Sequence, residues 1–211
     1  MRADGLILAG GKSSRMGGRH KGGLTYRENT FVQILIWEFW KKAGKIWLSY
    51  GREHHGAYGG CEILMDIYPD CGPVSGIHAG LSACEQEWMM VAACDMPLLK
   101  IELFQYLWEE LERAEHCRGM ENGEGNGKED QIYYEGAVPI LHGRLQPLAA
   151  IYRKSAAGIW EEQIKKESYR LRDTLKKMNI LYIDVTENAE FARMLRNVNT
   201  LEEYENLIGR E

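Results

Sequence analysis

The sequence predicts an α/β fold in three layers, a sandwich with a mostly parallel central sheet between helices. Short apolar segments of strand length alternate along the chain with longer segments of helical periodicity, the order typical of such sandwiches. The strand-like segments are apolar almost throughout, as in strands that a parallel sheet buries on both faces. With 211 residues, 45% hydrophobic, the chain can bury one sizeable core, and we expect a single domain over residues 1–211.

In the first half, apolar periodicity and the residues that end helices define the expected elements. Residues 5–10 predict a buried strand that opens into a glycine-rich loop. A helix is expected from Phe31, with Asn29 or Thr30 at its N-cap, two lysines in its last turn and Gly44 as its stop. Strands are then expected over "KIWLSY" and "EILMDI", followed by the small-residue segment "GPVSGIHAGLSACEQE" and a buried strand at "WMMVAACDMP".

The second half contains the clearest amphipathic helix and then a polar segment. Leucines and aromatic residues lie opposite a charged face over residues 98–116, which predicts a helix. The polar, glycine-rich stretch that follows predicts a flexible surface loop at about residues 118–130. Near the end, Thr200 is expected as an N-cap with Glu203 in the capping-box position. Helices are also expected over "AAGIWEEQIKK" and "LRDTLKKM", and a strand over "ILYID".

Charge is distributed unevenly along the chain. Residues 1–27 contain six lysines and arginines against the single acid Asp4, whereas the whole chain has a net charge of −5. A short cationic segment on an otherwise acidic protein favours a local anionic ligand over a long polyanion such as DNA. We therefore expect no nucleic-acid partner.

The cysteines, the histidines and the hydropathy of the chain predict a cytoplasmic protein without a zinc site. The five cysteines lie far apart without a CxxC pair, and we expect them to be buried small apolar residues in a reducing compartment. His54 and His55 have no spaced partner nearby and are expected on a surface loop. No apolar run approaches the roughly 18 residues of a membrane span, and the N-terminus does not resemble a signal peptide. We expect no membrane partner.

Residues 6–24, "LILAGGKSSRMGGRHKGGL", have the composition of a phosphate-binding loop. They do not form a P-loop, because Leu6 stands where that motif requires its first glycine. Glycines after a buried strand still let backbone amides approach phosphate oxygens, and basic side chains add charged donors. We therefore favour a triphosphate loop over a solvated surface turn. The residues concerned are Gly10, Gly11, Gly17 and Gly18, and the basic Lys12, Arg15, Arg19 and Lys21.

Asp95 ends the apolar run "WMMVAACDMP", at the edge where a doubly wound sheet places its ligands. A carboxylate there can hold Mg²⁺, which keeps several waters and binds substrate phosphates through one or two protein oxygens. The alternative is a helix cap before Pro97. The basic glycine loop favours the metal, because the loop would bind the phosphates while the metal neutralises their developing charge.

Several motifs give the chain a resemblance to a known family. "LILAGGKSSRMGG", Lys21, "GPVSG" at 72–76, "CDMP" at 94–97 and "NVNT" at 197–200 occur in the expected order over nearly the whole chain. In this combination the chain resembles the molybdenum cofactor guanylyltransferase family of Rossmann-like nucleotidyltransferases. The resemblance implies a Rossmann-like sandwich that transfers GMP from GTP to the terminal phosphate of molybdopterin or molybdenum cofactor. It also implies Mg²⁺ as cofactor and pyrophosphate as the second product.

The resemblance assigns residues in the N-terminal part to the nucleotide. Lys21 would contact its phosphates, and Arg15 would stabilise charge on the departing pyrophosphate. Asp66, at the end of the strand expected over "EILMDI", matches a family acid near the nucleoside. Asp95 matches the Mg²⁺ ligand. Backbone contacts with the guanine nucleotide are implied for the turn of Leu8, Ala9, Gly10 and Gly11.

The C-terminal part would bind the acceptor. Asn197 and Asn199 match the asparagines that the family associates with the pterin end, and Arg170 is a further candidate there. For the two asparagines the alternative is turn chemistry before the last helix. The resemblance also leaves room for transient contacts with other proteins of molybdenum cofactor biosynthesis.

Three positions depart from the family pattern and keep other functions open. His20 replaces an acid before the loop lysine, Ser49 stands where a nucleotide-contacting asparagine is common, and Gln146 replaces a frequent histidine. A serine can still make a hydrogen bond to the nucleotide. The alternatives are a relative that uses CTP or a sugar-phosphate acceptor, and a non-catalytic GTP-binding scaffold. The order Leu-Ala-Gly-Gly favours guanine, because cytidine-using relatives tend to have Leu-Ala-Ala-Gly.

Overall fold

A mixed sheet of eight strands runs through the part of the chain that the structure, a computed structural model, describes: residues 2–10, 21–51, 58–121 and 133–209. From edge to edge the order is β5 (Glu62–Leu64), β4 (Ala43–Ser49), β1 (Ala3–Leu8), β6 (Trp88–Ala93), β9 (Ala149–Arg153), β7 (Gly136–Leu141) and β10 (Ile180–Asp184), with β8 (Arg144–Leu145) beside β7. In this sheet the pairings of β9 with β6 and β7, and of β8 with β7, are antiparallel, and the others are parallel, which confirms the mostly parallel sheet.

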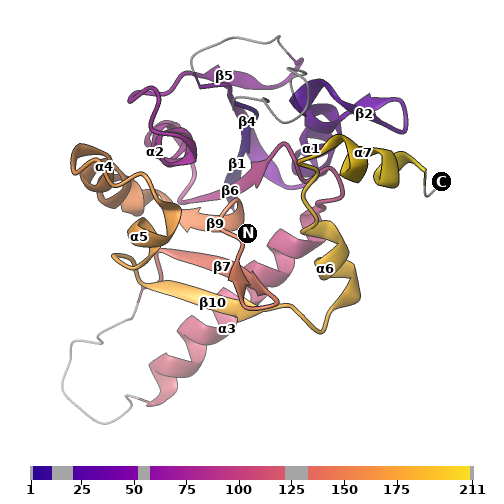
Figure 1. Ribbon diagram of the computed structural model, residues 1–211. Coiled ribbons are helices and arrows are strands. Elements are labelled where there is room, and N and C mark those ends of the chain that lie inside the picture. Colours follow the sequence, from indigo (N-terminus) through magenta and orange to yellow (C-terminus); the bar gives the residue numbers. More distant parts are fainter. Residues whose placement is uncertain (1, 11–20, 52–57, 122–132, 210–211) are drawn as a thin grey trace.

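Helices cover both faces of the sheet, which confirms the three layers (Figure 1). The side chains of β6 alternate between the two cores: Met90 faces one, whereas Met89 and Val91 face the other. One face carries α1 (Phe31–Trp40), α3 (Ile101–Glu121) and α6 (Ala189–Met194), and the other carries α2 (Pro73–Ala83), α4 (Ala157–Lys165) and α5 (Leu171–Leu175). Among the described residues, no helix has both the length and the apolar content needed to cross a membrane.

Helix α1 begins as the sequence predicts and ends earlier. The Thr30 hydroxyl accepts from the backbone amide of Gln33, and the Gln33 side chain accepts from the Thr30 amide, which together form a capping box. The predicted stop at Gly44 is wrong, because Lys41 already caps the helix and Gly44 lies in β4. The buried carboxylate of Asp4 accepts from the amide next to Gly44, so strand pairing sets this boundary.

Other boundaries differ from the sequence predictions in the same way. The first strand spans Ala3–Leu8, not residues 5–10, and β5 ends at Leu64, so Asp66 lies beyond the strand. The predicted loop at about 118–130 is partly wrong, because α3 continues to Glu121; residues 122–130 lie outside the described part. The capping box of Thr200 and Glu203 is confirmed at the start of α7 (Leu201–Ile208).

The cysteine predictions agree with the structure for three of the described residues. Cys71, Cys84 and Cys94 are buried, while Cys61 is half-buried. None of these four cysteines forms a disulfide with another described residue. The side chain of Cys117 lies outside the described residues, as do His54 and His55.

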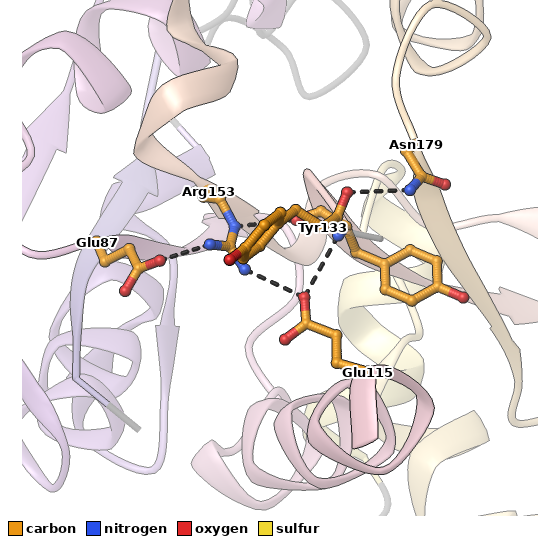
Figure 2. Close-up of polar contacts among 6 residues, drawn as sticks. Glu87, Glu115, Tyr133, Arg153 and Asn179 are labelled. Atoms are coloured by element: carbon orange, nitrogen blue, oxygen red, sulfur yellow. Dashed lines mark hydrogen bonds and ion pairs between the residues drawn. The ribbon is translucent and has the colours of Figure 1, made fainter. Parts of the chain in front are cut away.

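Arg153, the last residue of β9, links the C-terminal half of α3 to the sheet (Figure 2). It pairs with the first residue of β6, so it lies at the opposite edge of the sheet from Asp95. Its guanidinium forms ion pairs with Glu87 and Glu115, and its Nε donates to the Tyr134 carbonyl at 3.0 Å. It also lies over the Trp88 ring, 4.4 Å from the centroid. The side chains of Arg153 and Glu115 are only 13% and 25% exposed, so their ion pair is well shielded from solvent, whereas Glu87 is 64% exposed.

We expect Arg153→Met to lower the free energy of unfolding by about 2 kcal/mol, because it leaves half-buried Glu115 without its cation. For a chain of this size this corresponds to a fall of roughly 4–8 °C in Tm, measurable by calorimetry. The control is Glu87→Gln, which removes an ion pair to a side chain that is 64% exposed. The control should change Tm little; equal effects of both variants would contradict the assignment.

Candidate active site

The ends of β1, β4 and β6 meet through backbone hydrogen bonds beyond the sheet pairs. The amides of Ala9 and Gly10 both donate to the Ser49 carbonyl, at 2.7 and 3.1 Å. The Cys94 amide donates to the Leu8 carbonyl at 3.0 Å. Gly10 is exposed, and a Cβ there would lie 2.7 Å from the Tyr50 carbonyl group. Only glycine allows this approach, which leaves an open turn at the carboxyl edge of the sheet.

Ser49 and Asp66 form a hydrogen-bonded pair beside that turn. The Ser49 hydroxyl donates to Asp66 Oδ1 at 3.1 Å. Burial raises the pKa of the Asp66 carboxyl above its usual 3.8, while the hydrogen bond from the Ser49 hydroxyl opposes that shift. Gly76, in the first turn of α2, makes room for the pair, because a Cβ there would lie 3.0 Å from the Ser49 hydroxyl. The serine that departs from the family pattern therefore orients the acid.

Asp95 follows β6 and is half-buried at the same edge of the sheet. Its carbonyl accepts from the Val198 amide at 2.7 Å, which brings the segment with Asn197 and Asn199 to the metal-ligand candidate. Asn197 is exposed and Asn199 is half-buried. The backbone of Asn199 is consistent with the alternative of turn chemistry before the last helix, since its amide donates to the Glu203 carboxylate at 2.6 Å.

The residues at this edge fit Mg²⁺ better than a metal that requires a full protein cage. Within the described ranges, no three His, Cys, Asp or Glu side chains gather around one point. Mg²⁺ needs only one or two carboxylates, because water and substrate phosphates complete its shell. Asp95, half-buried just after β6, could supply one such carboxylate.

Arg170 lies in an open pocket of about 500 Å³ beside the start of α2. Three cationic side chains line it against one acid, Asp173, so the pocket favours an anionic ligand. We missed Arg172 and Lys176 in the sequence, although basic residues at 170, 172 and 176 around a short helix were a signal for it. The lining consists of Pro73, Tyr169, Arg170, Leu171, Arg172, Asp173 and Lys176.

Part of the predicted phosphate loop lies outside the described residues. This applies to Gly11, Arg15 and His20, and to the side chain of Lys21. The backbone at Lys21 begins the short helix η2 (Lys21–Gly23). Gln146, the third departure, lies in a turn whose Leu148 carbonyl accepts from the Ala93 amide at 2.9 Å, which places that turn near the end of β6.

The chain is similar to known nucleotidyltransferases. The family model of MobA-like NTP transferase domains matches residues 5–180. A probable molybdenum cofactor guanylyltransferase of Clostridium perfringens (strain 13 / Type A) is 34% identical over 217 residues, which cover 100% of this chain and 98% of that relative.

Two crystal structures have a similar fold. Molybdopterin-guanine dinucleotide biosynthesis protein A from Archaeoglobus fulgidus has a TM-score of 0.75 at 20% identity, covering 98% of this chain and 97% of its own. The 2-C-methyl-D-erythritol 4-phosphate cytidylyltransferase from Thermus thermophilus has a TM-score of 0.68 at 12% identity, covering 100% of this chain and 98% of its own. At these identities the likeness concerns the fold alone.

Proposed function

Because the chain belongs to the family of MobA-like NTP transferase domains, we propose that it transfers GMP from GTP to the terminal phosphate of molybdopterin or molybdenum cofactor. The reaction forms the guanine dinucleotide cofactor and releases pyrophosphate. The observation that carries this proposal is the meeting of the Gly10 turn, the Ser49–Asp66 pair and Asp95 at one edge of the sheet. Since GTP and the acceptor are cytoplasmic metabolites, we also propose the cytoplasm as the location.

We assign the guanine nucleotide to the turn at the end of β1. The amides of Ala9 and Gly10 already donate to Ser49, so this turn would use carbonyl oxygens toward the N–H donors of guanine. Leu8 belongs to the same turn, and Gly11 continues it in the sequence. The pair of Ser49 and Asp66 would hold the nucleoside through its hydroxyl or amino groups.

The chemistry at the α-phosphorus requires positioning and charge stabilisation. The acceptor phosphate attacks in line, so no protein nucleophile is needed. Lys21 and Arg15 would hold the phosphates and the departing pyrophosphate. Asp95 would hold Mg²⁺, which when bound neutralises charge that develops on the phosphates.

The acceptor is anionic, and two groups of residues suit it. Arg170, Arg172 and Lys176 give the pocket beside α2 its positive charge. Asn197 and Asn199 lie on the segment bonded to the Asp95 carbonyl. We propose that Arg170 and the asparagines bind the acceptor, which would place its phosphate on the Asp95 side of the nucleotide.

A panel of nucleotides tests the function. We expect pyrophosphate release from GTP when molybdopterin and Mg²⁺ are present, and none when EDTA removes the metal. Release should be measured with ATP, CTP, GTP and UTP at equal concentrations, with and without acceptor. Equal turnover of CTP would contradict the guanine assignment, and turnover with a sugar phosphate would contradict the acceptor. Tight GTP binding without pyrophosphate release would favour a scaffold.

A further inference from the structure

The C-terminal helix α7 contacts a segment far away in the sequence. The Tyr204 hydroxyl donates to the Thr25 carbonyl at 2.8 Å. The Tyr204 ring also packs edge-on against Phe31, with 6.1 Å between the centroids. Figure 1 shows α7 beside β2 and the start of α1, although these elements come from opposite ends of the chain. None of the side chains of α7 is fully buried, so the helix does not extend the main cores.

The contact forms a small apolar cluster of its own, separate from the cores on the two faces of the sheet. Leu24, Phe31 and Val198 are its buried members, and three side chains pack around them: Tyr26, Tyr204 and Leu207. Val198 also donates to the Asp95 carbonyl. One short C-terminal segment therefore connects the Asp95 edge of the sheet to Leu24 and Thr25, which follow Lys21 closely in the sequence.

The segment that α7 holds is unstable by itself. It is a hairpin of two-residue strands, β2 (Thr25–Tyr26) and β3 (Asn29–Thr30), too short for independent stability. Its turn residues Arg27 and Glu28 have φ angles of 47° and 66°, a conformation that favours glycine or asparagine. The hairpin thus depends on contacts from outside, and α7 supplies one of them.

We propose that Tyr204 is a positioning residue, which holds the β2–β3 hairpin so that the preceding Lys21 is presented to the nucleotide phosphates. This inference rests on the proposed function, because it assigns the hairpin a role in GTP binding. Tyr204 itself would not touch the substrate. Its hydroxyl fixes the Thr25 carbonyl, and its ring fixes Phe31 at the other end of the hairpin.

Tyr204→Phe tests the proposal, because it keeps the ring and removes only the hydroxyl. We expect the KM for GTP to rise about fivefold, the scale of one net hydrogen bond, with kcat changed less than about twofold. Without nucleotide, amide hydrogen exchange over residues 24–31 should accelerate by about the same factor. The control is Tyr182→Phe, a substitution at an exposed tyrosine on β10, which should change neither quantity.

A second variant distinguishes positioning from general loosening. Glu28→Gly removes the unfavourable positive φ angle of a non-glycine residue in the turn. When it is added to Tyr204→Phe, the KM for GTP should fall most of the way back to the wild-type value, and the hydrogen exchange should slow again. Unchanged exchange in Tyr204→Phe would overturn the proposal, as would faster exchange with an unchanged KM. If the wild type neither binds nor turns over GTP, the proposed function fails and the role of Tyr204 in GTP binding fails with it. The exchange measurement then still decides whether Tyr204 holds the hairpin.

Discussion

Asp95→Asn is expected to lower the rate of pyrophosphate release from GTP by about 10³-fold. The substitution keeps the size of the side chain and removes the negative charge that would hold Mg²⁺ among the substrate phosphates. Loss of one preorganised electrostatic group in an active site costs about 10²–10³-fold, and the loss of a metal should lie at the upper end. Asp95 is half-buried at the end of β6, where the backbone bonds of Leu8 and Val198 fix its position.

The measurement is a Mg²⁺ titration of the rate for the wild type and the variant. We expect half-saturation of the variant to move to higher Mg²⁺, so that part of the loss is recovered at high metal concentration. Asp184→Asn is the matched control, because Asp184 also ends a parallel strand and its bond from the Thr186 amide can persist in the variant. If Asp95→Asn has the same Mg²⁺ dependence as the wild type, Asp95 is not the metal ligand.

The elements that the sequence predicted well are those whose signals are local. The start of α1 and the start of α7 depend on residues three apart, Thr30 with Gln33 and Thr200 with Glu203, and the structure contains both capping boxes. The end of α1 depends on a remote contact. Ala43 pairs with Ala3 of β1, and that pairing overrides the helical preference of the residues before Gly44.

Local sequence patterns did not predict strand direction or the geometry of the site, because both depend on contacts between residues far apart in the sequence. The apolar run of β9 has the same period whichever way it runs, so periodicity does not indicate that it is antiparallel to β6. The contact between Ser49 and Asp66 depends on the pairing of β4 with β5. The pocket of Arg170 joins Pro73 to a helix that lies about a hundred residues later. Sequence motifs named several members of the site, and tertiary structure decided which of them touch.

Asp66→Asn should have opposite effects on activity and stability. We expect kcat/KM for GTP to fall about 100-fold, because a hydrogen bond from the nucleotide to a charged acceptor is lost. The free energy of unfolding at neutral pH should rise, since burial makes the ionised carboxylate less favourable in the folded protein than in the unfolded chain. The amide oxygen of asparagine can still accept from Ser49, so the variant keeps that bond. Enzyme kinetics and chemical denaturation measure the two effects.

The difference in stability between Asp66→Asn and the wild type should depend on pH, and this dependence shows whether the ionised carboxylate causes it. The folded-state pKa of Asp66 is raised above 3.8, so between the unfolded and folded pKa values the native protein binds more protons than the unfolded chain. The stabilising contribution of Asp66 is therefore complete below the unfolded pKa and is lost as the pH rises through the folded pKa. The free energy of unfolding of Asp66→Asn should be closest to that of the wild type at acid pH and should exceed it at neutral pH. If the variant is less stable than the wild type at neutral pH, the hydrogen bond from Ser49 outweighs the cost of burying the carboxylate.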